Sequence, residues 1–184
     1  MQKVLYLFGE LNDDDLDWLI AAGSIEKIPP TATLIKEGEI SDAVYILLEG
    51  TVVVSVAVLG SSKEIATLSS GEIFGEMSFI DQQPPSATVE TLTESLVLSV
   101  PSAQLKARLA QDLSFASRFY RAMAVFLSGR LRIALTELDF GKDFLSPELA
   151  LSPALLESLP LAQARFDWLL RRVKNSLMPN SPEY

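Results

Sequence analysis

The sequence predicts a mainly β fold flanked by helices. Between Ile25 and about Val100, short runs of β-branched and aromatic residues alternate with turn signals, a pattern typical of an antiparallel sandwich or barrel. Apolar residues recur at helical spacing before this block and again after Pro101, which indicates helices on both sides of it. The 184 residues suffice for one well-buried domain with an appendage.

The first expected element is a short amphipathic helix that begins after Asn12. Asn12 is a good N-cap, and Asp13, Asp14 and Asp15 follow where the helix dipole favours negative charge. Gly23 stands where such a helix would stop. The three aspartates fit a dipole-complementing first turn better than a metal site, and the metal alternative stays open at this point.

The strands are expected in runs such as AVYILLEG and TVVVSVAVLG. Four glycines supply the turns between the runs, namely Gly38, Gly50, Gly60 and Gly71. Glu49-Gly50 joins two strand-like runs directly, which predicts a tight hairpin there.

Two helices are expected after the strands. Ser102 can cap one that runs to about Leu109, and a longer one runs from about Asp112 to Leu138. The longer helix carries an apolar stripe that includes Phe115, Phe119, Ala122, Met123, Phe126, Leu131 and Ile133. Such a helix can lie on its own sheet, pack on its twin in a second subunit, or do both. We therefore expect a protein partner or a homodimer through the 112–138 helix.

Residues 139–184 are expected to form a Pro-containing tail beside a main domain at residues 1–138. The segment FLSPELALSPALLESLP predicts a linker with short helical turns, and a short amphipathic helix with an apolar stripe from Phe166 to Leu177 follows. We expect this stripe to dock on the body as a lid or brace. The helix also carries the cations Arg165, Arg171, Arg172 and Lys174. They favour a solvated face over contact with nucleic acid or membrane.

Composition narrows the functional classes. The chain has no histidine and no cysteine, which removes the commonest general base, the commonest metal ligand and thiolate chemistry. We therefore expect a non-enzymatic protein with no catalytic residues and no metal site. A net charge of −9 repels phosphate backbones and anionic lipid, so neither nucleic acid nor membrane is expected as a partner. The acidic N-terminus lacks the apolar core of a signal peptide, which favours a cytoplasmic protein.

The stretch GEIFGEMSFIDQQPPSATVET, which starts at Gly71, carries the chemistry of a binding site. Gly71 and Gly75 permit positive φ or a close backbone approach, and the first amides of a helical turn after Gly75 suit an anion. Glu76 can accept hydrogen bonds from two ribose hydroxyls, and Ser86 and Thr88 offer hydroxyls on the returning strand. Taken alone, these residues also fit a plain loop between two strands.

The order of these parts from Leu7 to Leu138 resembles the cyclic nucleotide-binding domain of cAMP receptors, protein-kinase regulatory subunits and cyclic-nucleotide-gated channels. KIPPTATLIKEGEISDAVYILLEGTVVVS resembles the family's opening strands, and FGEMSFIDQQPPSATV its phosphate-binding cassette, here residues 74–89. The resemblance implies an eight-stranded antiparallel jelly roll (a double-stranded β-helix) with flanking helices and a signalling role. It places the ligand-binding positions at Gly75, Glu76, Met77, Ser78, Pro85, Ser86, Ala87 and Thr88.

One position departs from the family pattern. The family's arginine, which pairs with the cyclic phosphate, falls on Pro85, and proline supplies neither a cation nor a backbone donor. The resemblance therefore implies cAMP or cGMP, or another small anionic ligand, at reduced affinity. Replacement cations from the last helix would be Arg118, Arg121, Arg130 or Arg132.

These observations predict a regulatory or sensor module with weakened or altered ligand binding. The alternative is a ligand-independent interaction or scaffolding subunit on the same fold. An enzyme on a related β-barrel such as a cupin conflicts with the absence of histidines. No pair of capped helices with a basic recognition face follows Leu138, so no DNA-binding domain is expected.

Overall fold

The computed structural model of the chain describes residues 6–137 and 153–177. One compact unit consists of residues 17–111, and the other combines the chain up to Leu16 with the part from Asp112 onward. Within the described ranges, every helix is too short or too polar to cross a membrane.

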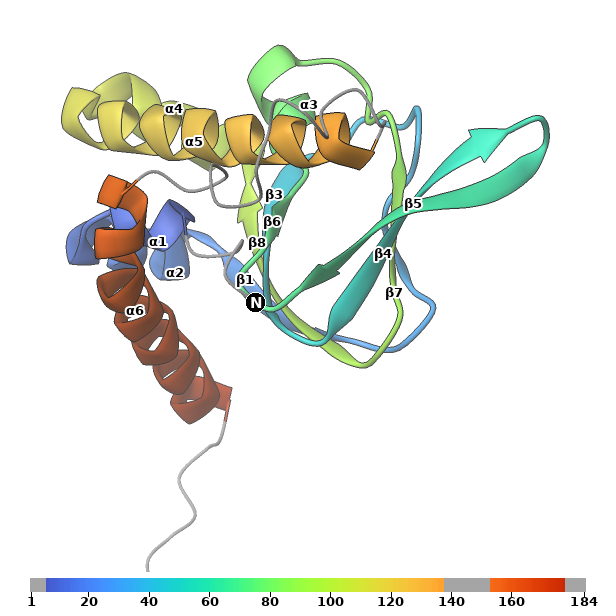
Figure 1. Cartoon of the computed structure of the whole chain (residues 1–184). Coiled ribbons are helices and arrows are strands. Elements are labelled where there is room, and N and C mark those ends of the chain that lie inside the picture. Colours follow the sequence, from blue (N-terminus) through green and yellow to red (C-terminus); the bar gives the residue numbers. More distant parts are fainter. Residues whose placement is uncertain (1–5, 138–152, 178–184) are drawn as a thin grey trace, which may run out of the picture. The chain divides into compact units, whose positions relative to one another are not determined.

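The first unit is built from eight strands (Figure 1). These are β1 Ser24–Ile28, β2 Thr33–Ile35, β3 Ala43–Glu49, β4 Thr51–Val58, β5 Ser61–Ser69, β6 Ile73–Phe74, β7 Thr88–Thr91 and β8 Ser95–Pro101. They pair antiparallel in two four-stranded sheets, with the orders β1-β8-β3-β6 and β2-β7-β4-β5. Both sheets contribute to one buried core, formed by Ile35, Leu47, Val52, Leu68, Phe74, Val89 and Val97. The predicted eight antiparallel strands are confirmed.

The turn at Gly50 differs from the expected hairpin. β3 ends at Glu49 and β4 begins at Thr51, yet the two strands belong to different sheets. Gly50 has a φ of 97°, and a Cβ there would lie 2.3 Å from Ser95 Oγ, so the corner between the sheets requires glycine. The hairpin prediction is wrong because strands that share a core show the same apolar alternation whether they pair or change sheet.

A tight hairpin instead connects β4 and β5. Val58 pairs with Ser61, and the two residues between them, Leu59 and Gly60, have φ values of 50° and 83°. Positive φ at both central positions is the type I′ pattern, which matches the twist of paired strands. The hairpin projects beyond the rest of the β unit (Figure 1).

Helix α2, Asp13–Ala22, begins where the sequence predicts. The Asn12 side chain accepts a hydrogen bond from the Asp15 amide at 2.9 Å, and the Asp15 carboxylate accepts one from the Asn12 amide at 3.0 Å. This reciprocal pair resembles a capping box. Asp15 is 1% exposed and also accepts hydrogen bonds from Nε and Nη2 of Arg118, at 2.6 Å and 2.8 Å. These bonds raise the pKa of the Arg118 guanidinium, which therefore stays charged.

The metal alternative for the aspartates finds no support in the described part of the chain. No three acidic side chains gather there as a cation site. Asp15 is bound by Arg118, and Asp13 accepts a hydrogen bond from Arg165 Nε at 2.8 Å. Two of the three carboxylates are therefore neutralised by arginines from distant parts of the sequence.

Helices α4, Ser102–Gln111, and α5, Leu113–Glu137, follow the strands close to their expected limits. Asp112 caps α5 by accepting a hydrogen bond from the Phe115 amide at 2.9 Å. The expected apolar stripe of α5 is buried at Phe115, Phe119, Ala122, Met123 and Phe126. Helix α1, Tyr6–Glu10, packs against α5 within the second unit. The predicted helix end and domain boundary at Leu138 lie outside the described residues.

Helix α6, Pro153–Leu177, corrects the expected course of the tail. A linker with short turns is expected up to Pro160, but α6 runs through Pro160 as one helix of 25 residues. Pro153 stands in the first turn, where a missing N–H is tolerated. Tertiary packing supplies most of the stability of helices in proteins, and here it outweighs the helix-breaking tendency of Pro160. The expected linker residues before Pro153 lie outside the described ranges.

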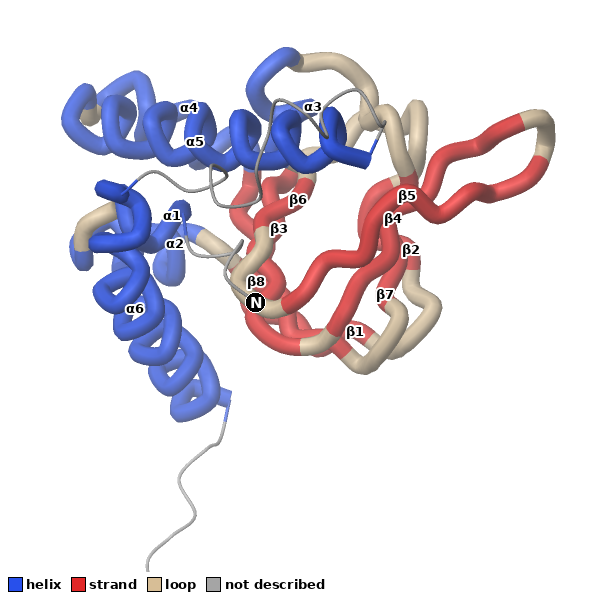
Figure 2. Tube along the Cα trace, in the orientation of Figure 1, coloured by secondary structure: helices blue, strands red, loops and turns tan. Residues whose placement is uncertain are grey.

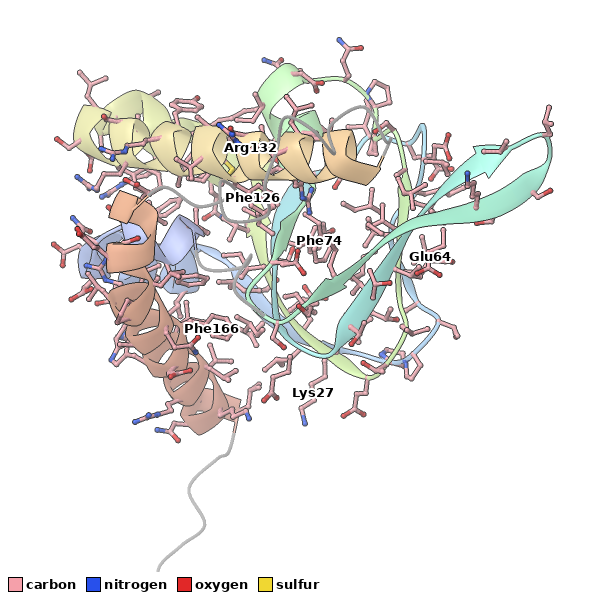
Figure 3. The ribbon with its side chains drawn as sticks, viewed as in Figure 1. Lys27, Glu64, Phe74, Phe126, Arg132 and Phe166 are labelled. Carbon is pink, nitrogen blue, oxygen red and sulfur yellow. The ribbon has the colours of Figure 1, made fainter. Side chains whose placement is uncertain are left out.

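Helix α6 packs on α1, and both helices belong to the same compact unit. The ring of Phe166, labelled on α6 in Figure 3, meets the ring of Phe8 edge to face with centroids 5.2 Å apart. Arg165 donates to Asp13 and also, through Nη1, to the Phe8 carbonyl at 3.2 Å. A Cβ on Gly9 would lie 3.2 Å from Ser158 Oγ, so glycine lets the two helices approach closely.

Candidate functional site

The candidate site lies on the segment between β6 and β7, which holds helix α3, Glu76–Asp81, and a loop (Figure 2). Gly75 precedes α3 with a φ of 81°. A Cβ at this position would lie 3.0 Å from the Ala43 carbonyl oxygen and 3.2 Å from Ile35 Cδ1. Gly75 therefore combines both properties that the sequence indicates, a left-handed backbone and a close approach.

An aromatic pair supports the start of the segment. The rings of Tyr45 and Phe74 stack nearly parallel, at 8°, with centroids 5.0 Å apart. Phe74, labelled in Figure 3, belongs to the core between the sheets, and Tyr45 packs against that core. Burial raises the pKa of the Tyr45 phenol, while hydrogen bonds with Ser41 and Ser99 lower it to a smaller extent. The phenol is therefore neutral at physiological pH. Its ring packs on Phe74, the residue before Gly75.

Helix α3 buries its acidic first residue. Glu76 is 2% exposed and stands where the helix dipole favours a carboxylate. The Phe79 amide donates to the Gly75 carbonyl at 3.3 Å, and the Gln82 amide donates to the Ser78 carbonyl at 3.0 Å. The predicted ligand residues around Glu76 differ in exposure, because Met77 is 51% exposed and Ser78 is half-buried.

The returning segment is fastened to the loop after β2. Pro85 is buried, and its carbonyl accepts a hydrogen bond from the Gly38 amide at 2.8 Å. Thr88 Oγ1 accepts one from the Glu37 amide at 3.1 Å. The Thr88 hydroxyl, expected to face a ligand, thus has a structural contact.

The other two predicted residues of the returning segment differ in exposure. Ser86 is exposed and Ala87 is half-buried. The structure therefore buries Glu76 and Pro85, leaves Gly75 half-buried, and exposes Met77 and Ser86.

Acidic groups predominate around residues 74–89. Glu37 Oε2 accepts a hydrogen bond from the Ala57 amide at 2.8 Å, and Asp81 Oδ1 accepts one from the Gln83 amide at 2.9 Å. Glu76 adds a third, buried carboxylate. On the cationic side, Lys106 Nζ lies 5.9 Å from the centroid of the Phe79 ring of α3.

The arginines expected as replacement cations belong to the other compact unit. Arg118 is bound to Asp15, and Arg121 pairs with Glu10 at 3.1 Å. The Arg130 guanidinium lies 4.4 Å from the centroid of the Phe126 ring. Arg132 is exposed. At least Arg118 and Arg121 are thus engaged with carboxylates of their own unit.

Comparison with known sequences decides the family. The sequence model of the cyclic nucleotide-binding domain matches residues 25–112, which include all of residues 74–89. The chain is also 30% identical to the cAMP-activated global transcriptional regulator CRP of Pasteurella multocida over 146 residues, which cover 71% of this chain and 69% of that regulator. The chain belongs to the cyclic nucleotide-binding domain family. Residues 74–89, which the sequence predicts as the phosphate-binding cassette, lie within the matched span and are called the cassette below.

Other relatives of the family share parts of this chain. The potassium channel AKT2 of Oryza sativa is 34% identical over 106 residues, 56% of this chain, and the chain spans only 12% of that channel's length. The solved cyclic nucleotide-binding domain of Methylobacillus flagellatus superposes with a TM-score of 0.68 at 20% identity, covering 79% of this chain and 85% of that one. The expected jelly roll with flanking helices is confirmed, as is a domain of regulatory type.

Sequence reasoning missed the loop that fastens the cassette. Gly38, with a φ of 78°, is recognisable as a turn, but its contact with Pro85 spans 47 positions of the chain. The same holds for Glu37 and Thr88, which are 51 positions apart. The glycine signals the turn, and no local pattern reveals what the turn touches.

Proposed function

We propose that this cyclic nucleotide-binding domain is a non-enzymatic cytoplasmic regulatory module whose cassette binds cAMP, cGMP or another small anion weakly. One observation carries the proposal. Pro85 is buried in the cassette, at the position where the family pattern has the arginine that pairs with the cyclic phosphate. A proline ring there offers no charge and no hydrogen-bond donor, and its carbonyl already accepts from Gly38.

The expected loss of affinity follows from the missing charge pair. Removing one side of a buried, hydrogen-bonded charge pair typically costs about 2–5 kcal/mol. At about 1.4 kcal/mol per factor of ten, this weakens binding about 30-fold to several thousand-fold.

Isothermal titration with cAMP and with cGMP tests the proposal on the full chain. The unmodified protein should bind both weakly, and Pro85→Arg should raise the affinity by about tenfold or more. Pro84→Arg is the matched control, since it adds the same charge one residue earlier at an exposed position, and it should change little. Low-micromolar binding by the unmodified protein would contradict the proposal, as would an isotherm that Pro85→Arg leaves unchanged.

Self-association through α5 is the second part of the proposed function. Leu113, Tyr120 and Leu131 are 81%, 50% and 61% exposed, although they are large and apolar or aromatic. Their spacings of 7 and 11 residues keep them on one side of a helix. This stripe supports a homodimer or a protein partner at α5.

Analytical ultracentrifugation tests the dimer. The unmodified protein should be a dimer, and the double variant Tyr120→Glu, Leu131→Glu should be a monomer. A monomeric unmodified protein would contradict the dimer.

A further inference from the structure

A side of α6 beside its buried stripe has the chemistry of a binding surface. Ala162, Phe166, Leu169 and Val173 are buried along one side of the helix. On another side, a shallow hollow of about 400 Å³ is lined by Trp168, Arg171, Arg172, Asn175 and Ser176. These five residues, with Leu161, are called the α6 basic face.

The hollow is rich in hydrogen-bond donors. Arg171 and Arg172 bring two guanidinium groups, and Asn175 brings an amide. The Ser176 hydroxyl donates to the Arg172 carbonyl at 3.0 Å, so its own proton is already used. Guanidinium groups bind carboxylates in a bidentate manner more readily than other cations do. The donor set therefore fits an acidic ligand.

An exposed aromatic ring orders one of these cations. Trp168 is 40% exposed, and the Arg172 guanidinium carbon lies 5.2 Å from the centroid of its ring. A cation held over an aromatic face loses less conformational freedom when it binds an anion. Trp and Arg are also the residues most enriched at the energetic centres of protein interfaces.

The α6 basic face has an apolar side as well. Leu161 is 52% exposed and precedes Trp168 by seven residues, so both lie on one side of the helix. Apolar anchors two helical turns apart suit a partner helix better than a lone anion.

Charge selects among the macromolecules that could occupy this surface. The chain as a whole carries a net charge of −9, and salt screens charges beyond about 10 Å at 0.1 M. A short acidic segment meets mainly the local cations of α6. An extended nucleic acid or an anionic membrane meets the acidic remainder of the surface as well.

We propose that the α6 basic face binds an acidic amphipathic helix of a partner protein. Carboxylates of the partner pair with Arg171 and Arg172, and its apolar residues cover Trp168 and Leu161. The surface lies outside the cassette, so it does not depend on whether a cyclic nucleotide binds there.

A labelled synthetic peptide tests this surface on the full chain by fluorescence anisotropy at about 0.1 M salt. The probe is a helical peptide with leucines at i, i+3 and i+7 and glutamates on both flanks, and its counterpart carries glutamine at each glutamate position. The protein should bind the acidic peptide and not the glutamine peptide. The double variant Arg171→Glu, Arg172→Glu should weaken binding by about tenfold or more.

Two further variants separate this surface from a general charge effect. Lys174→Glu changes charge on the same helix outside the hollow and should alter binding by less than about threefold, as expected for an exposed charge. Trp168→Ala keeps every cation and should still weaken binding about tenfold, as loss of an interface anchor does. Circular dichroism checks that each variant stays folded.

Several results would overturn the proposal. One is absence of binding to the acidic peptide, and another is equal binding by the unmodified protein and both hollow variants. Stronger Arg171- and Arg172-dependent binding to a DNA duplex or to phosphatidylserine vesicles would assign the surface to a polyanion instead. Self-association that these two arginines control would assign it to a second copy of the chain.

Discussion

Replacing Arg118 tests whether the ion pair with Asp15 holds α5 to the start of α2. Arg118→Met keeps most of the aliphatic stem and removes the guanidinium, which donates to both carboxylate oxygens of Asp15. Asp15 is 1% exposed, so its charge would be left buried, and within the described part of the chain the Asn12 amide and the helix dipole would remain to stabilise it.

The magnitude follows from burial. Removing one partner of a buried ion pair costs about 3–5 kcal/mol. The Arg118 side chain keeps 31% exposure, so water can partly replace it, and we expect the lower end, about 3 kcal/mol. For a chain of this size, 1 kcal/mol corresponds to about 2–4 °C in the melting temperature. The variant should therefore melt about 6–12 °C lower.

Arg121→Met is the matched control for this variant. Arg121 lies on the same helix and pairs with Glu10, but its side chain is 72% exposed. An exposed pair is worth about 1 kcal/mol or less. Urea unfolding followed by circular dichroism should show a large midpoint shift for Arg118→Met and a small one for Arg121→Met. If the two variants lose free energies of unfolding that agree within about 0.5 kcal/mol, the reasoning is refuted, because the two ion pairs differ mainly in burial.

Two other variants probe the unit that carries the cassette. Gly75→Ala should destabilise the protein more than Gly38→Ala in urea unfolding. The φ values of the two glycines are similar, 81° and 78°, but of the two only a Cβ at Gly75 meets neighbours within 4 Å. Equal losses in the free energy of unfolding would mean that the close approach does not matter. Burial raises the pKa of Tyr45 above its ordinary value of 10.0. The neutral phenol therefore contributes its full stabilisation below pH 10.0. This contribution is lost as the pH rises through the folded-state pKa. The stability difference between the unmodified protein and Tyr45→Phe should therefore be constant below pH 10.0 and move against the unmodified protein above it; a constant difference at all pH values would show that burial of the phenol has no such effect.

Local features of the fold could be predicted from neighbouring residues. Asn12 and Asp15 are three positions apart, and their side chains and amides form the cap at the start of α2. The turn into helix α3 at Gly75 and Glu76 was predictable for a similar reason, whereas the role of residues 74–89 as the cassette stays a prediction. The weakened binding at Pro85 stays a prediction.

Long-range features could not be predicted in the same way. The sequence pattern is the same for a hairpin and for a sheet-to-sheet corner at Gly50, and the pairing of β3 with β8 and of β4 with β7 decides between them. Pro160 argues locally against a helix, yet α6 continues through it because Phe166 and Arg165 contact α1.

By itself, the sequence determined the strand-rich block, the cap of α2 and the absence of histidine and cysteine, because each depends on one residue or on near neighbours. Only the tertiary structure decided that Asp15 meets Arg118 across 103 positions and that Gly38 holds the cassette at Pro85. Such contacts depend on which surfaces exclude water together, and the free energy of burial is a property of the whole packed unit rather than of any short segment.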